Sequence, residues 1–179
     1  FESAKYVCAP PLRKKEDQDC LWKGLADGTI QTVSTDHCSF TTEQKKLGEG
    51  DFTKIPGGMP GAETRGTLIY TYGVDKGRIT KEDMCRVLSE NPAKLYGLYP
   101  RKGVIAPGSD ADLVIMRTGV EDVITAKDQV QNVDYAPFEG TKVTGRVESV
   151  FLRGLQAVKD GKVVEEKKGE FLKRGKYAL

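Results

Sequence analysis

The sequence has a single histidine, His37, and this scarcity limits the catalytic sites that it can build. A cysteine nucleophile needs a base close to its sulfur, and Cys38 has only the adjacent His37 to serve it. Neighbouring residues of a strand point to opposite faces, so His37 is badly placed for that task. We therefore expect no Cys–His nucleophile in this chain.

The four cysteines include no CxxC pair, which disfavours a metal knuckle or a thioredoxin-like redox motif. Their number is also low for a small domain held together by disulfides. We expect four reduced thiols and a cytoplasmic protein. The cysteines are Cys8, Cys20, Cys38 and Cys85.

Long apolar runs are missing too: none approaches the roughly 18 residues of a membrane span. The formal net charge is only +2, with acids and bases interspersed, so neither a nucleic acid nor a membrane is expected as a partner. The first 15 residues contain no long apolar core, which predicts no signal peptide. The chain starts at Phe1 without an initiator Met, and we expect a fragment or a processed chain.

The first part of the sequence, up to about residue 98, predicts alternating helices and strands. Residues 15–28 begin with acids and end at Asp27-Gly28, which predicts a helix. Thr80 and Asp83 form a capping-box pattern, and Asn91-Pro92 is typical of a new helix start. Strands are predicted at 6–13 and 29–35, helices at 15–28, 63–77, 80–90 and 91–98, and a long Gly/Pro-rich loop at 43–63. This order is typical of an α/β fold.

The pattern changes near residue 99. Residues 113–116 predict a strand, and residues 143–166 predict two or three more, with Asp160-Gly161 as a hairpin turn. No long helix is predicted after residue 100, and the glycines of the segment 145–154 form no phosphate-binding loop. We expect two domains, at 1–98 and 99–179, the second a small β domain.

Asp36 follows the β-branched stretch 29–35 directly. If that stretch is a strand of an α/β barrel, Asp36 lies at the carboxyl end, where such barrels place their active sites. The long loop that follows would then be a lid over the substrate. The alternative is that Asp36 only caps the next turn. The residue pattern alone leaves both readings open.

Several segments together resemble the C-terminal part of the D-hydantoinase/dihydropyrimidinase family of cyclic amidohydrolases. They are STDHCSF, GEGDFTKIPGGMPGAETR, ENPAKLYGLYPRKGVIAPGSDADLVI and NVDYAPFEGTKV. The resemblance covers essentially the whole chain, in order. It implies the C-terminal segment of a (β/α)8 barrel of the TIM type, followed by part of a β-sandwich domain.

The resemblance also implies a zinc centre with two ions in the intact enzyme. Asp36 would ligate one zinc and take the proton of the metal-bound hydroxide, a role that suits a carboxylate. The remaining family ligands, four histidines and a carboxylated lysine, would lie upstream of this chain. The chain by itself should therefore be inactive, and His37 should have a structural role.

Two positions depart from the family pattern. Ala9 replaces the usual Ser before Pro-Pro, and Gly57 replaces the Asn of KIPNG. In the family both positions hold the cyclic amide largely through main-chain groups, so Ala9 and Gly57 stay candidate substrate-binding residues. Gly57 also frees the loop backbone.

The implied reaction opens hydantoin or dihydropyrimidine rings to N-carbamoyl amino acids, with a small cyclic amide or ureide as substrate. One alternative is a non-catalytic dihydropyrimidinase-like protein that acts in assembly; retention of Asp36 favours the enzyme. Another is an allantoinase or dihydroorotase, against which the DFTKIP segment argues. Family members are commonly oligomers, so a homotetramer or homodimer is expected.

Overall fold

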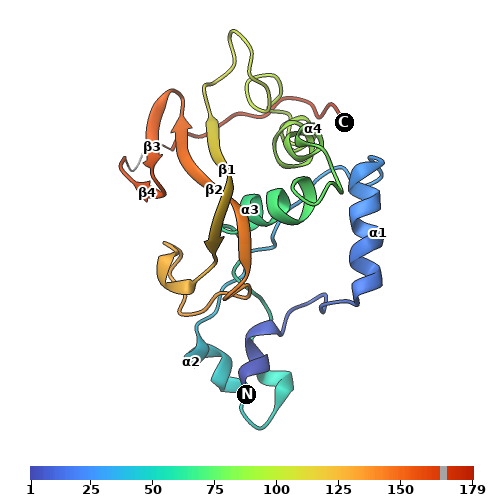
Figure 1. Ribbon diagram of the computed structural model, residues 1–179, viewed down its shortest axis with the longest axis vertical. Coiled ribbons are helices and arrows are strands. Elements are labelled where there is room, and N and C mark those ends of the chain that lie inside the picture. Colours follow the sequence, from blue (N-terminus) through green and yellow to red (C-terminus); the bar gives the residue numbers. More distant parts are fainter. Residues whose placement is uncertain (166–168) are drawn as a thin grey trace.

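The computed structural model describes residues 1–165 and 169–179. Helices occupy the first part of the chain and an antiparallel sheet the second, as Figure 1 shows. The α-helices are α1 Lys15–Ala26, α2 Thr42–Lys45, α3 Arg65–Ile69, α4 Lys81–Cys85 and α5 Asn91–Leu95. The strands are β1 Leu113–Val123, β2 Lys142–Leu152, β3 Leu155–Lys159 and β4 Lys162–Val163. Short 3-10 turns lie at Glu2–Tyr6, Lys46–Gly48, Phe52–Lys54 and Ala126–Asp128.

Helix α1 confirms the prediction for residues 15–28. The Asp17 carboxylate accepts a hydrogen bond from the Lys14 amide and so satisfies one free donor at the helix start. At the other end Gly28 takes a φ of 81°, a conformation that glycine adopts without strain. The Asp27 carboxylate accepts a hydrogen bond from the Thr29 amide, which turns the chain away from the helix.

The two strands predicted at 6–13 and 29–35 are wrong, because neither segment pairs with another strand. The Val7 carbonyl instead accepts a hydrogen bond from the Gly58 amide of a loop. The Val33 amide donates to the carbonyl of Val87, which is a helical residue. A β-branched sequence favours extended backbone, but a strand also needs a neighbouring strand for its hydrogen bonds. The described residues offer none to either segment.

The predicted helices at 80–90 and 91–98 form one continuous helix. The residues between α4 and α5, Arg86–Glu90, make a π turn, so the helix does not end before Asn91. Asn91 was expected to cap a new helix, but its buried side chain donates to the backbone carbonyl of Gln31 at 2.8 Å. The predicted helix at 63–77 is confirmed as α3 followed by a π turn, Tyr70–Val74.

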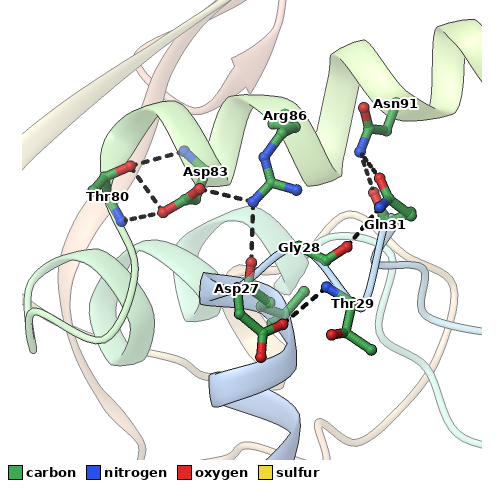
Figure 2. Close-up of polar contacts among 9 residues, drawn as sticks. Asp27, Gly28, Thr29, Gln31, Thr80, Asp83, Arg86 and Asn91 are labelled. Atoms are coloured by element: carbon green, nitrogen blue, oxygen red, sulfur yellow. Dashed lines mark hydrogen bonds and ion pairs between the residues drawn. The ribbon is translucent and has the colours of Figure 1, made fainter. Parts of the chain in front are cut away.

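A network of polar contacts joins this long helix to the end of α1 (Figure 2). The predicted capping box is confirmed: Thr80 Oγ1 accepts from the Asp83 amide, and the Asp83 carboxylate accepts from the Thr80 amide. Arg86 Nη2 donates both to the Asp83 carboxylate, at 2.7 Å, and to the Leu25 carbonyl, at 3.0 Å. Together with the Asn91 contact, these bonds fix the start of the segment that leads to Asp36.

Replacing Asp83 with alanine is expected to lower the free energy of unfolding by about 1–2 kcal/mol, because the helix cap and the Arg86 contact are lost together. Arg86 and the Thr80 amide hold the pKa of the Asp83 carboxyl below its usual value. Because the pKa of Asp83 is lower in the folded protein than in the unfolded chain, where it is near 3.8, its ionised form stabilises the fold when the pH is above 3.8. This stabilisation is lost as the pH falls through the pKa of the folded protein.

Urea unfolding at pH 7 and at pH 3 tests this prediction, with Glu82→Ala as the control because Glu82 is the adjacent, exposed acid. The destabilisation should be clear at pH 7 and smaller at pH 3. An equal effect of both substitutions, or one that does not change with pH, would contradict it.

The four strands form one antiparallel sheet in the order β1-β2-β3-β4. The predicted hairpin at Asp160-Gly161 is confirmed, since both residues have positive φ, as a type I′ turn requires. A second hairpin of the same kind occurs at Arg153-Gly154. Strand β1 is longer than the predicted 113–116. The predicted stretch 143–166 ends at a residue outside the described ones.

Two apolar cores support this arrangement. The first centres on the buried Leu25, Ile79 and Val87, between α1 and the long helix. The second centres on Ile124, Ala136 and Val143, under the sheet. Helix and sheet meet very closely at Gly145, where an added Cβ would lie 2.4 Å from the Tyr70 ring. A side chain at position 145 would therefore push β2 away from the helices.

The described residues thus form a small α/β unit with one antiparallel sheet. They contain no parallel strand pair and no second sheet, so the (β/α)8 barrel, the β-sandwich and the boundary at residues 98 and 99 stay predictions. Within the described part of the chain, no helix is long and apolar enough to cross a membrane.

Candidate functional site

Asp36 lies on an exposed, irregular segment instead of at the end of a strand. Its φ is 46°, in the left-handed region that non-glycine residues enter rarely, although aspartate tolerates it better than most. Immediately after it, the Cys38 amide donates to the Met59 carbonyl at 3.2 Å. Asp36 is therefore exposed, while the chain on its carboxyl side is tied to the long loop.

His37 holds that same loop. Its Nδ1 accepts hydrogen bonds from the amides of Gly61 and Ala62, both at 3.1 Å. A ring nitrogen that accepts two hydrogen bonds has no lone pair left for a metal, so Nδ1 of His37 is occupied by the loop. This contact gives His37 the structural role expected from the sequence.

Three separate segments meet beside Asp36. The Gly58 amide donates to the Val7 carbonyl at 2.9 Å, which joins the neighbourhoods of Gly57 and Ala9. Gly58 also packs against Cys38 so closely that an added Cβ would lie 2.3 Å from the Cys38 carbonyl oxygen. The structure thus brings together the chain neighbours of all three predicted site residues. Asp36, Ala9 and Gly57 are themselves exposed.

Lys45 lies at this junction and was missed by sequence reasoning. Only 1% of the residue is exposed, and its ammonium donates to the carbonyls of Val7, Pro56 and Gly58 at 3.0, 2.6 and 2.9 Å. Burial lowers the pKa of Lys45 below that of a free lysine. The polar run around it, EQKKLGE, reads as a solvated surface, and nothing in it separates Lys45 from the exposed Lys46.

A mainly apolar groove of about 710 Å³ passes close to the junction, between α1, α3 and the segment 29–35. Asp36 is not among the residues that line it, although Thr35 is. The groove therefore borders the candidate site without containing its carboxylate. Its lining includes Trp22, Val33, Thr35, Met59, Arg65 and Tyr72.

Among the residues that the structure describes, the metal-binding side chains near Asp36 are too few for a catalytic metal site. A catalytic zinc takes about three protein ligands from histidine, cysteine or carboxylate side chains. Within residues 1–165 and 169–179, no three such side chains lie together. Asp36 offers one exposed carboxylate, so a complete metal site does not fit the described residues alone.

Comparison with known proteins identifies the family. The family model described as "Amidohydrolase family" matches residues 4–164. A D-hydantoinase from Geobacillus stearothermophilus is 50% identical over 179 residues, which are 99% of this chain and 38% of that protein. A D-hydantoinase from Streptomyces coelicolor is 50% identical over 159 residues, 88% of this chain and 34% of that protein.

Solved structures of hydantoinases and a dihydropyrimidinase are similar to this chain as well. The D-hydantoinase of Bacillus sp. AR9 superposes with a TM-score of 0.97 at 47% identity, over 100% of this chain and 39% of that one. The dihydropyrimidinase of Brevibacillus agri NCHU1002 has a TM-score of 0.97 at 46% identity, with the same coverage. The chain thus spans only about two fifths of the length of these relatives. With the family model matched over residues 4–164, it belongs to the amidohydrolase family.

Proposed function

We propose that the protein carrying this chain hydrolyses a cyclic amide C–N bond and opens hydantoin or dihydropyrimidine rings to N-carbamoyl amino acids. The observation that carries this proposal is the 50% identity to the D-hydantoinase of Geobacillus stearothermophilus over 99% of the chain. The 46% identity to a dihydropyrimidinase supports the same substrate class. The substrate is a small cyclic amide or ureide.

Asp36 is the proposed catalytic residue. Hydrolysis requires a water molecule to lose a proton as it attacks the ring carbonyl, and the ring nitrogen to gain one as the C–N bond breaks. A single carboxylate can make both transfers if it lies beside the two atoms. The exposure of Asp36 leaves its carboxylate free to meet a substrate.

Ala9 and Gly57 are the proposed substrate-binding residues, through their main-chain groups. Both are exposed, and the Gly58–Val7 hydrogen bond keeps their segments together. Backbone amides and carbonyls at a fixed spacing suit a ring that carries both donors and acceptors. Ala9 and Gly57 lack the side chains usual in the family, but their main-chain groups can still make these hydrogen bonds.

Members of the amidohydrolase family are metal-dependent. We propose zinc as the metal and Asp36 as the one ligand from this chain, with the others supplied from outside these 179 residues. A bound zinc would polarise the ring carbonyl and make water more acidic. A cytoplasmic homotetramer or homodimer is the assembly that we propose.

The proposal is tested by assaying the full-length protein, supplied with zinc, on hydantoin, dihydrouracil, allantoin and dihydroorotate. We expect ring opening of hydantoin and dihydrouracil, detected as N-carbamoyl product, and little turnover of the other two. Preference for allantoin or dihydroorotate would move the protein to those enzyme classes. Turnover of none of the four would contradict the enzyme and favour a non-catalytic role in assembly.

A further inference from the structure

Lys45, at the end of α2, is buried in a way that lysines rarely are. Only 1% of the Lys45 residue is exposed, whereas 51% of the side chain of the adjacent Lys46 is exposed. Burying an ammonium ion is costly unless its lost contacts with water are replaced. Among the described residues no carboxylate forms an ion pair with Lys45. The compensation must come from elsewhere.

Main-chain carbonyls replace the lost contacts with water, and there are as many of them as the ammonium has N–H donors. An ammonium has three N–H donors, and Lys45 directs them to three carbonyl oxygens, of Val7, Pro56 and Gly58. The Phe40 ring lies 5.5 Å from Nζ and adds a cation–π contact. A neutral amine would have only two donors for the three oxygens, so the full set of three contacts requires the ammonium form.

The carbonyls belong to two segments that are far apart in sequence. Val7 precedes Ala9 by two residues, and Pro56 and Gly58 flank Gly57. The Val7 carbonyl also accepts from the Gly58 amide, so the same oxygen is held from both sides. One ammonium thus fixes the spacing between the two candidate substrate-binding segments.

We propose that Lys45 is a positioning residue whose ammonium holds the backbone segments at Ala9 and Gly57 at the spacing that a cyclic amide requires. This inference rests on the proposed function, and it adds a specific role for a residue that does not touch the substrate. Loss of the ammonium leaves the Pro56 and Gly58 carbonyls without this donor. The Val7 carbonyl then keeps only the Gly58 amide, so among the described residues a single hydrogen bond holds the two segments together and they can move apart. Substrate binding should suffer more than the chemical step at Asp36.

The test uses the full-length protein with zinc and compares Lys45→Met with Lys46→Met, because methionine keeps most of the apolar stem and removes every donor. With the preferred cyclic amide, Lys45→Met should raise KM about tenfold or more and change kcat less than about threefold, as expected when binding alone is lost. Lys45→Arg, which keeps charge and donors, should recover part of the affinity. Lys46→Met should behave like the unaltered protein.

Amide hydrogen exchange provides a measurement that needs no activity. In Lys45→Met the peptides that contain residues 7–9 and 56–58 should both lose protection, whereas the α1 peptide should not change. If both loosen and KM rises, the proposal holds. An unchanged KM in an active, folded Lys45→Met protein would overturn it, as would an equal effect of Lys46→Met.

If every Lys45 variant failed to fold, Lys45 would be needed for folding and the positioning role would be overturned. An unaltered protein that turns over none of the four cyclic compounds is a different result. It would remove the proposed function and the substrate role of Lys45 with it, whereas the exchange data would still report whether Lys45 joins the segments.

Discussion

Asp36→Asn in the full-length protein is expected to reduce kcat for hydantoin or dihydrouracil by about 10³-fold or more. A positioned acid–base group contributes 10²–10⁴-fold, and loss of a metal ligand would add to this. Asparagine is the informative substitution because it also tolerates the left-handed backbone that Asp36 adopts, with φ of 46°. Alanine would add backbone strain and confuse catalysis with folding.

Asp75→Asn is a suitable control, because Asp75 is another exposed acid at a helix end. It should leave kcat unchanged, and the melting temperatures of both variants should stay close to that of the unaltered protein. If Asp36→Asn kept near-normal turnover, Asp36 would have no catalytic role and would be an acid that caps a turn.

Gly58→Ala is expected to lower the free energy of unfolding by about 3 kcal/mol, from overpacking and backbone strain together. An added Cβ would lie 2.3 Å from the Cys38 carbonyl oxygen and 2.8 Å from the Cys38 Cβ. Its backbone φ of 153° is also unfavourable for a residue with a side chain. The loop could relieve the clash only by moving away from Cys38, which would displace the segment that carries Asp36.

Gly57→Ala is the matched control, since an added Cβ there meets nothing within 4 Å. It should change stability by less than about 0.5 kcal/mol. Gly57→Asn, which introduces the residue usual in the family, should also fold normally. Urea unfolding together with hydantoin turnover measures all three variants. Equal effects at positions 57 and 58 would show that the loop does not pack against Cys38 as described.

Local signals in the sequence were sufficient for much of the helical structure. Helix α1 and the capping box at Thr80 follow from contacts between residues three or four positions apart, which any chain with this sequence would make. The turn at Asp160-Gly161 likewise needs only two residues that accept positive φ. The break expected at Asn91 did not occur, because the Asn91 side chain bonds to Gln31, sixty residues earlier in the chain.

By itself, then, the sequence determined most of the helices, the hairpin turn at Asp160-Gly161, the family resemblance and Asp36 as the candidate carboxylate. Only the tertiary structure decided that residues 6–13 and 29–35 form no strands here, because a strand depends on a partner that local sequence does not specify. It alone distinguished Lys45 from Lys46, two adjacent lysines in one polar run. Burial and the three carbonyl partners come from segments at residues 7 and 56–58, and no local pattern around residue 45 records them.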